Sequence, residues 1–337
     1  MSLKYLLKVL ICILGLLGVL YYFGGGKKIV RRLKKRKEVY SNVSMEKVDD
    51  INKFIDILKN NKELEARRQS YKNGKICVFL IVFTVILGCI VLDIFNLFFV
   101  LVVIALVFAI LSFSKIGYTK IYKNQVITSI LKNYDKEICY MPENGIDRSV
   151  YSSAEFEKFD RYNSEDLIVG KICDLNFSLA DVHIEDEKTD SEGRTTYTTI
   201  FFGPVAVIEL NTLTDFVLHI SDNQIKLFRE KYFVESDNQV FEEKYDVFTN
   251  NDVVAMRILT PSLTTKILEM HNKFGLFCEI KLINGLVFFR FHCDTLFKPN
   301  PGDIEKEATE IAFYFNMLDG MKMIMKEIVT NLQGFEK

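Results

Sequence analysis

Residues 76–113 read ICVFLIVFTVILGCIVLDIFNLFFVLVVIALVFAILSF. Two runs free of charged residues, 76–92 and 97–113, lie on either side of a short break, Asp93-Ile94-Phe95-Asn96. At about 1.5 Å per residue in a helix, each run is long enough to cross most of a hydrocarbon core of roughly 30 Å. The break is too short to be a domain. The stretch therefore predicts a helical hairpin that crosses a bilayer and returns, so that both of its flanks share one compartment.

A third apolar run lies near the N-terminus, from Val9 to Phe23. A secretory signal peptide also has a short basic start and an apolar stretch, but it ends in small residues, whereas this run ends in Tyr21-Tyr22-Phe23. We therefore expect residues 1–26 to be an uncleaved transmembrane anchor with its N-terminus outside.

The next segment, residues 27–37, is strongly basic. By the positive-inside rule, such a cluster holds its side of the membrane in the cytoplasm. The same charges attract anionic lipid headgroups by about 1 kcal/mol per cation. The candidate membrane-surface residues are Lys27, Lys28, Arg31, Arg32, Lys34, Lys35, Arg36 and Lys37.

The chain divides into a basic membrane part and an acidic soluble part. Residues 1–137 carry a net charge of +13 and residues 138–337 a net charge of −14. An acidic domain is a poor partner for nucleic acid, because phosphate contacts need clustered Lys or Arg. The predicted parts are an anchor (1–26), a basic and helical cytoplasmic segment (27–75), a transmembrane hairpin (76–114), a juxtamembrane helix (115–137) and a soluble α+β domain (138–337).

Helical periodicity precedes and follows the hairpin. Val48, Ile51, Ile55 and Leu58 recur at three- and four-residue spacing, which predicts a helix within 38–72. We expect this helix to end at Asn73-Gly74-Lys75. After the hairpin, one apolar helix face is predicted, made of Ile116, Ile121, Val126, Ile127, Ile130 and Leu131.

The soluble domain shows strand patterns followed by helices. The polar residues 146–166 are expected to cross the surface. Residues 167–184 and 195–210 predict a long β-hairpin. Its loop, residues 185–194, is acidic, but the acids lack the spacing of an EF-hand and favour a solvated loop over a calcium site. Another strand is predicted at 241–248, and helices are predicted at 253–259, 261–273 and 303–333.

The clearest local signal is Asn284-Gly285 between two apolar runs. A two-residue hairpin turn needs positive φ at both positions, which Asn and Gly tolerate. The resulting register places Glu279 opposite Arg290 on one face and only apolar pairs on the other. Together these patterns predict an antiparallel sheet with covering helices, preceded by three transmembrane helices.

Several stretches carry a resemblance to a known bacterial family. They are Glu165-Asp166-Leu167-Ile168-Val169-Gly170, Phe201-Phe202-Gly203, Phe241-Glu242-Glu243-Lys244-Tyr245-Asp246-Val247-Phe248 and Val254-Ala255-Met256-Arg257-Ile258-Leu259-Thr260-Pro261. From about Tyr140 onward, the order of features resembles the family of the domain of unknown function number 3137. The resemblance implies a membrane hairpin followed by one cytoplasmic α+β domain. It implies no activity and no catalytic residues, and the extra N-terminal span departs from it.

Catalytic and metal-binding signatures are missing from the sequence. There is no H-E-x-x-H, G-x-S-x-G, P-loop or G-x-G-x-x-G motif, and no C-x-x-C pair. We therefore name no catalytic, cofactor-binding or metal residues. The soluble cysteines suit a reducing cytoplasm, although they could also form two disulfides; they are Cys139, Cys173, Cys278 and Cys293.

The function that these observations favour is a non-enzymatic interaction or regulatory module, tethered to the cell membrane with its soluble domain in the cytoplasm. Its expected partners are a bilayer with anionic headgroups, an unknown protein and, as an open alternative, further copies of itself. Two other functions stay open. One is a membrane-surface enzyme that uses the carboxylates of residues 160–192, and the other is a subunit of an oligomeric membrane complex or pore.

Overall fold

The computed structural model describes residues 48–92, 97–212, 214–222, 234, 236–274 and 277–333 of the chain. The predicted N-terminal anchor, residues 1–26, lies outside these described residues.

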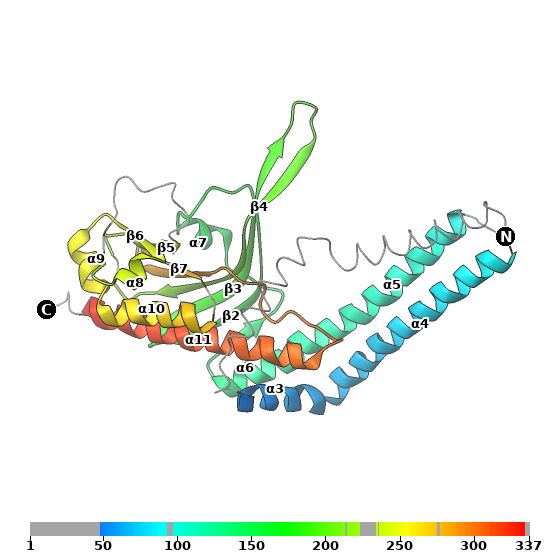
Figure 1. Cartoon of the computed structure of the whole chain (residues 1–337). Helices are drawn as coiled ribbons and strands as arrows, with labels where there is room; N and C mark the ends of the chain where they lie inside the picture. Colours follow the sequence, from blue (N-terminus) through cyan, green and yellow to red (C-terminus); the bar gives the residue numbers. More distant parts are fainter. Residues whose placement is uncertain are drawn as a thin grey trace.

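The first described part is helical. Its elements are α3 (Val48–Asn60), α4 (Lys62–Leu92), α5 (Leu97–Ile121), the π-helix η2 (Tyr122–Ile127) and α6 (Thr128–Tyr134). α4 and α5 lie side by side and antiparallel, and together they extend away from the rest of the molecule (Figure 1). Paired helices thus occupy the predicted hairpin. Within the described residues, no helix meets both the length and the hydropathy required of a membrane span.

The predicted helix end at Asn73-Gly74-Lys75 is wrong, because α4 runs through it without a break. A glycine inside a helix costs only about 1 kcal/mol relative to alanine, and helical residues on both sides offset that cost. The interruption lies earlier, at Asn61, between α3 and α4. The Asn61 side chain accepts the Leu64 N–H at 2.9 Å, which is typical of a residue that caps a helix start.

The predicted juxtamembrane helix is present as far as Tyr134, but part of it is η2. There the Thr128 N–H bonds to the carbonyl of Lys123, five residues back. Such π-turns insert one extra residue and change the direction in which the following side chains point. Val126 and Ile127 are buried as predicted, whereas Ile116 is 64% exposed.

Among the described residues, eight antiparallel strands form one sheet in the order β1-β2-β3-β4-β8-β7-β5-β6. The strands are β1 (Cys139–Met141), β2 (Arg161–Ile172), β3 (Leu175–Thr189), β4 (Thr195–Glu209), β5 (Leu218–Asp222), β6 (Tyr245–Thr249), β7 (Cys278–Ile283) and β8 (Leu286–Phe291). The sheet and its helices confirm the predicted α+β class.

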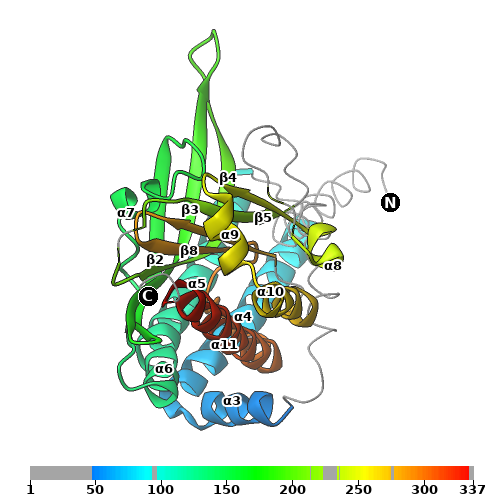
Figure 2. The same cartoon turned by 90° about the vertical axis from the view of Figure 1, so that its left-hand side faces the viewer.

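The remaining helices are α7 (Arg148–Ser152), α8 (Gln239–Glu242), α9 (Asp252–Ile258), α10 (Pro261–Phe274) and α11 (Ile304–Gln333). Figure 2 shows α10 and α11 side by side across one face of the sheet. The predicted helices at 253–259, 261–273 and 303–333 are confirmed. Gly320, inside α11, lies where Met270 of α10 approaches: a Cβ there would be 3.3 Å from the Met270 sulfur.

Two apolar cores lie on the two faces of the sheet. Alternate residues of β8 show this: Phe289 and Phe291 enter the larger core beneath α10 and α11, and Phe288 enters the smaller one. The smaller core is closed by residues 146–159, with Tyr151 of α7 fully buried in it. The sheet is therefore buried on both faces around β4, β7 and β8.

The predicted turn at Asn284-Gly285 is confirmed, with φ of 51° and 76°. Its register is also confirmed, because Glu279 pairs with Arg290. A second such turn, Cys173-Asp174, has φ of 52° and 62° and divides the predicted strand 167–184 into β2 and β3. Cysteine gives no turn signal, which is why the sequence did not reveal it.

Two further boundaries differ from the prediction. The polar stretch 146–166 contains the start of β2, and β3 extends into the predicted loop, which leaves residues 190–194 as the connection to β4. The predicted strand 241–248 begins only at Tyr245. Before it lies α8, because Asn238 accepts the Phe241 N–H at 3.2 Å and so caps a helical turn.

Candidate functional site: the junction of the helix pair and the sheet

The far part of the helix pair has an apolar outer surface. On α4, Phe79 is 69% exposed, and on α5, Phe113 is 76% exposed. The other large apolar side chains that are more than half exposed there are Ile76, Leu80, Phe83 and Leu106, and Ile116 is also exposed, one residue nearer to the domain than Lys115. A soluble protein rarely exposes so many neighbouring apolar side chains.

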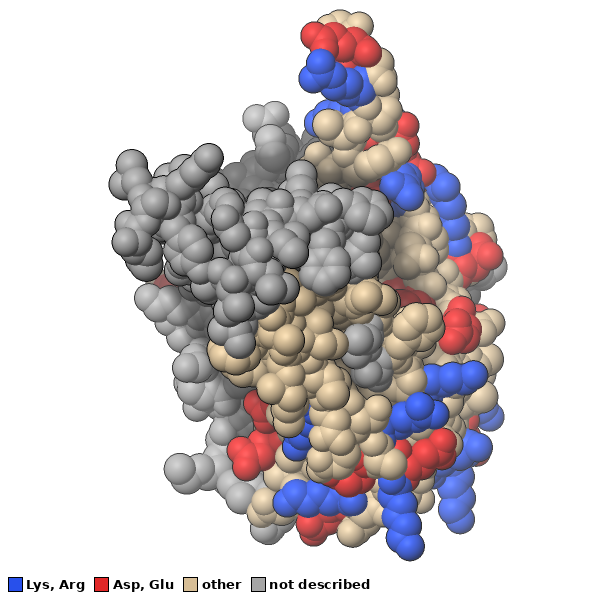
Figure 3. All heavy atoms as spheres, turned by 90° about the vertical axis from the view of Figure 1, so that its right-hand side faces the viewer, with Lys and Arg blue, Asp and Glu red and all other residues tan. Residues whose placement is uncertain are grey.

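Lysines lie at the end of this apolar surface that is nearer to the sheet. Lys75 of α4 and Lys115 of α5 are exposed and immediately precede or follow the apolar runs. The Lys75 ammonium lies 4.7 Å from the ring of Tyr71. Tyr and Lys are common where a helix leaves a hydrocarbon core. Figure 3 views the molecule from the side to which the pair points, and below an uncharged surface Lys and Arg side chains are interspersed with Asp and Glu side chains.

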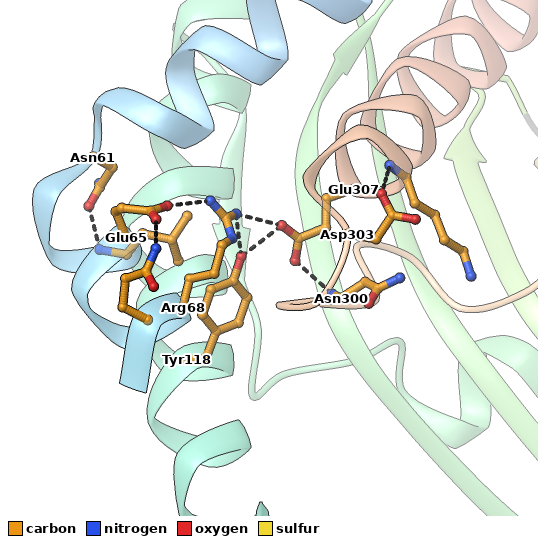
Figure 4. Close-up of polar contacts among 10 residues, drawn as sticks. Asn61, Glu65, Arg68, Tyr118, Asn300, Asp303 and Glu307 are labelled. Atoms are coloured by element: carbon orange, nitrogen blue, oxygen red, sulfur yellow. Dashed lines mark hydrogen bonds and ion pairs between the residues drawn. The ribbon is translucent and has the colours of Figure 1, made fainter. Parts of the chain in front are cut away.

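At its base, the pair is joined to the domain by a buried ion pair. The Arg68 guanidinium of α4 lies 2.9 Å from the Glu307 carboxylate of α11 and also donates to the Tyr118 hydroxyl of α5 at 2.8 Å (Figure 4). Tyr118 donates to the same Glu307 oxygen at 2.7 Å. The other Glu307 oxygen accepts the Asn300 N–H at 2.6 Å. The second terminal nitrogen of Arg68 donates to the Glu65 carboxylate at 2.8 Å. Three helices thus meet at one carboxylate.

Burial dominates the electrostatics of this ion pair. The Glu307 side chain has no exposed surface and that of Arg68 has 3%. Burial raises the pKa of Glu307, although Tyr118, Asn300 and Arg68 act in the opposite direction. Removing either partner would leave a charge without compensation in the interior.

A second buried contact joins η2 to the sheet. Lys123 lies 2.5 Å from one oxygen of Asp166, and the hydroxyl of Tyr140 donates to the other at 2.5 Å. Asp166 has φ of 62° at an irregularity between β2 and β3, and its N–H bonds to the carbonyl of Pro142. Burial raises the pKa of Asp166 even with Lys123 beside it.

Asp181 of β3 lies in the same buried region. One of its oxygens accepts the Leu296 N–H at 2.7 Å, and the other has no hydrogen-bond partner among the described residues. Burial, and then the charge of Asp166, raise the pKa of Asp181 well above its usual value. These two carboxylates belong to the region 160–192, and neither lines the cavity around Phe54 and Phe315 or the one around Leu210 and Phe216.

On the other face of the sheet, the predicted Glu279–Arg290 pair is formed, with 3.2 Å between Arg290 Nε and Glu279 Oε2. Arg290 also lies 2.7 Å from Glu157, and its guanidinium is 4.5 Å from the ring of Phe156. These contacts hold residues 154–160 over the smaller core. His219 lies 2.7 Å from Glu279 and helps to lower the pKa of that carboxyl against the effect of burial.

The predicted membrane-surface cations at 27–37 lie outside the described residues. Cys139, Cys173, Cys278 and Cys293 are all free thiols. In the described ranges, no group of three or more His, Cys, Asp or Glu could hold a metal ion. Sequence reasoning did not find Arg68 or Glu307, and it included Asp181 only among the carboxylates of residues 160–192. One signal was available: Glu307 falls within the apolar stripe of the last helix.

Residues 199–330 match the family model described as a protein of unknown function, DUF3137. Over these residues the chain is similar to the DUF3137 family. The predicted resemblance is confirmed there, including the stretches 201–203, 241–248 and 254–261, whereas 165–170 and the helix pair precede the matched range. The DUF3137 region holds β5 to β8 and most of α11, including Glu307.

No curated protein matches the chain. Among solved structures, a match is the crystal structure of the mycobacterial trehalose monomycolate transport factor A, TtfA, at 10% identity. It covers 60% of this chain and 97% of that chain, with a TM-score of 0.29. A likeness at this level supports no statement about the fold or function of this chain.

Proposed function

We propose that the chain is a membrane-tethered interaction module, in which the helix pair inserts into the bilayer and holds the α+β domain at its surface. The observation that carries the proposal is the exposure of large apolar side chains on both α4 and α5 where the pair extends beyond the sheet. In water each of these side chains would cost free energy, roughly 25 cal/mol per Å² of apolar surface. Insertion into lipid removes that cost.

The cations support one orientation. Four lysines flank the two apolar runs on the domain side: Lys72, Lys75, Lys115 and Lys120. A hairpin returns to the side from which it starts, so the basic segment 27–37, which precedes it, would lie on this side as well. By the positive-inside rule this side is the cytoplasm. The eight cations of residues 27–37 would then lie against anionic headgroups, with residues 1–26 as a further span.

A membrane-surface enzyme has less support, since Asp166 and Asp181 are engaged in the interior, Asp166 by Lys123 and Asp181 by the Leu296 N–H. The proposed role is binding, and it assigns no catalytic residue.

The chain offers a direct test, because it contains no tryptophan. In full-length protein reconstituted into vesicles, Phe83→Trp on α4 should be quenched by lipids brominated along their acyl chains and shielded from aqueous acrylamide. Val253→Trp on α9, where the native side chain is 67% exposed, should show the reverse. Equal acrylamide quenching at both positions would rule out insertion.

Orientation needs a separate measurement. Paired reporters fused after Lys337, one active only in the cytoplasm and one only outside, should place the C-terminus in the cytoplasm. An external signal would overturn the orientation while leaving insertion intact.

A further inference from the structure

We infer that two copies of this chain join edge to edge along β4, through the two-stranded ribbon that β3 and β4 form beyond the sheet. The ribbon pairs residues 185–189 of β3 with 195–199 of β4 and stands out from the body of the molecule (Figure 1). β2 pairs with β3 only as far as Glu185, and β8 pairs with β4 only from Val205. In the described part of the chain, the outer edge of β4 is therefore unpaired along the ribbon, whereas Asp160 bonds the outer edge of β3 at Glu185 and Glu187.

The two edges differ in charge. The β3 edge carries Glu185, Asp186, Glu187 and Lys188. The β4 edge, residues 195–203, reads TTYTTIFFG and carries no charge. Natural sheets protect exposed edges with charged residues, prolines or a covering element, because an unprotected edge pairs with other strands. By this criterion the β3 edge is protected, whereas the β4 edge is open to pairing with another strand.

Gly203 marks the inner end of the open edge. A Cβ at this position would lie 2.5 Å from the carbonyl oxygen of Phe291 and 3.0 Å from that of Cys293. The chain leaving β8 thus passes directly over Gly203 and covers β4 from there inward. The open part of the edge ends at Phe202.

An irregularity at Ile200 places the exposed aromatic residues on one face. Thr199 pairs with Glu185 and Phe201 with Ile184, so Ile200 is an extra residue on β4. Tyr197 and Phe202 are five residues apart and would otherwise point to opposite faces. Here they share a face: Phe202 packs on His183 at 5.1 Å, and Tyr197 lies beneath the Arg161 guanidinium at 4.4 Å.

A second copy fits this edge in one register. Two antiparallel β4 strands, related by a twofold axis between Thr199 and Ile200, place Tyr197 of each copy opposite Phe202 of the other. The pairing is confined to residues 197–202, and the strong twist of a two-stranded ribbon turns residues 190–196 of each copy away from β8 of the other. Aromatic pairs in this arrangement stabilise a sheet, and no like charges face each other anywhere along the paired stretch. A twofold contact is also closed, since it covers the uncharged β4 edge of both copies at once. This argument does not depend on membrane insertion.

The register predicts a specific crosslink. Residues opposite each other in antiparallel strands have Cα atoms about 4.5–5.5 Å apart, within the range of a disulfide. Because Ile200 is an extra residue, equivalent residues of the two copies would be four rungs apart, or roughly 14 Å. In full-length protein in detergent, the double variant Tyr197→Cys/Phe202→Cys should therefore form a disulfide-linked dimer on mild oxidation, and each single variant should not. The single variants carry the same native cysteines and control for them.

A matched pair of substitutions tests the edge itself. Thr198 and Asp186 face each other on one rung of the ribbon, on opposite edges. Thr198→Lys should convert the dimer measured by light scattering into a monomer, with at least a tenfold rise in the dissociation constant. Asp186→Lys should leave the dimer intact. A purified wild-type chain that stays monomeric, a dimer that survives Thr198→Lys, or single-cysteine crosslinks as strong as the double one would each overturn the inference.

Discussion

Arg68 and Glu307 are 239 residues apart in the chain, and their side chains lie 2.9 Å apart in the interior. One comes from the base of the helix pair, and the other from the first turn of the last helix. Tyr118, from the second helix of the pair, shares the same carboxylate oxygen. The connection between the pair and the sheet domain is thus a specific polar contact and not only apolar packing.

Arg68→Ala should lower the free energy of unfolding of the full-length protein by about 3–5 kcal/mol, because it leaves Glu307 buried without its counter-ion. Chemical denaturation in detergent would measure this. Arg67→Ala, at the exposed neighbouring position, should change stability by no more than about 0.5 kcal/mol. The neutral pair Arg68→Met/Glu307→Gln should recover most of the loss. If it is as unstable as Arg68→Ala, an uncompensated charge is not the cause.

Asp181 should make stability fall as pH rises. Its pKa is raised in the folded protein, mainly by burial, so the folded state holds its proton more tightly than the unfolded state does. The stabilisation is complete below the unfolded value of about 3.9 and is lost as pH rises toward the folded pKa. Asp181→Asn should therefore flatten the decline in unfolding free energy from about pH 4 upward. Identical slopes for the variant and the wild type would contradict this account.

Arg290→Lys should destabilise the smaller core by about 1–3 kcal/mol. Lysine keeps the charge but loses the planar group that contacts Glu157 and Glu279 and lies against the ring of Phe156. Thermal unfolding, followed by circular dichroism, would report the loss. Arg194→Lys, in the exposed connection between β3 and β4, is the matched control and should have no measurable effect.

Two glycines should respond differently to alanine. At Gly203 the new Cβ would meet backbone carbonyls at 2.5 and 3.0 Å, which cannot move aside cheaply, so Gly203→Ala should cost about 1–3 kcal/mol. At Gly320 the nearest atoms belong to the flexible Met270 side chain, and alanine gains up to about 1 kcal/mol in helix propensity. Gly320→Ala should be neutral or stabilising in denaturant unfolding. Equal losses of unfolding free energy at both sites would show that the carbonyl oxygens beside Gly203 are not what makes alanine destabilising there.

The elements that sequence reasoning predicted well are those specified locally. Asn284-Gly285 and the alternation around it determine both the turn and the Glu279–Arg290 register within one hairpin. The turn at Cys173-Asp174 was not predicted, because its positive φ values are imposed by the paired strands and not by the residues themselves. The Arg68–Glu307 contact depends on how α4, α5 and α11 pack together, which no local pattern encodes.

The unbroken course of α4 through Lys75 has a mechanical consequence. A domain attached by a flexible linker can turn freely above a membrane, because such a linker behaves as a random coil. Here a single 31-residue helix reaches from the base of the domain to the far end of the pair, and the ion pair at its base connects it to α11. With the pair inserted as proposed, the helix acts as a rigid lever. It fixes the height and tilt of the sheet above the bilayer, and any tilt of the pair is carried directly to the domain.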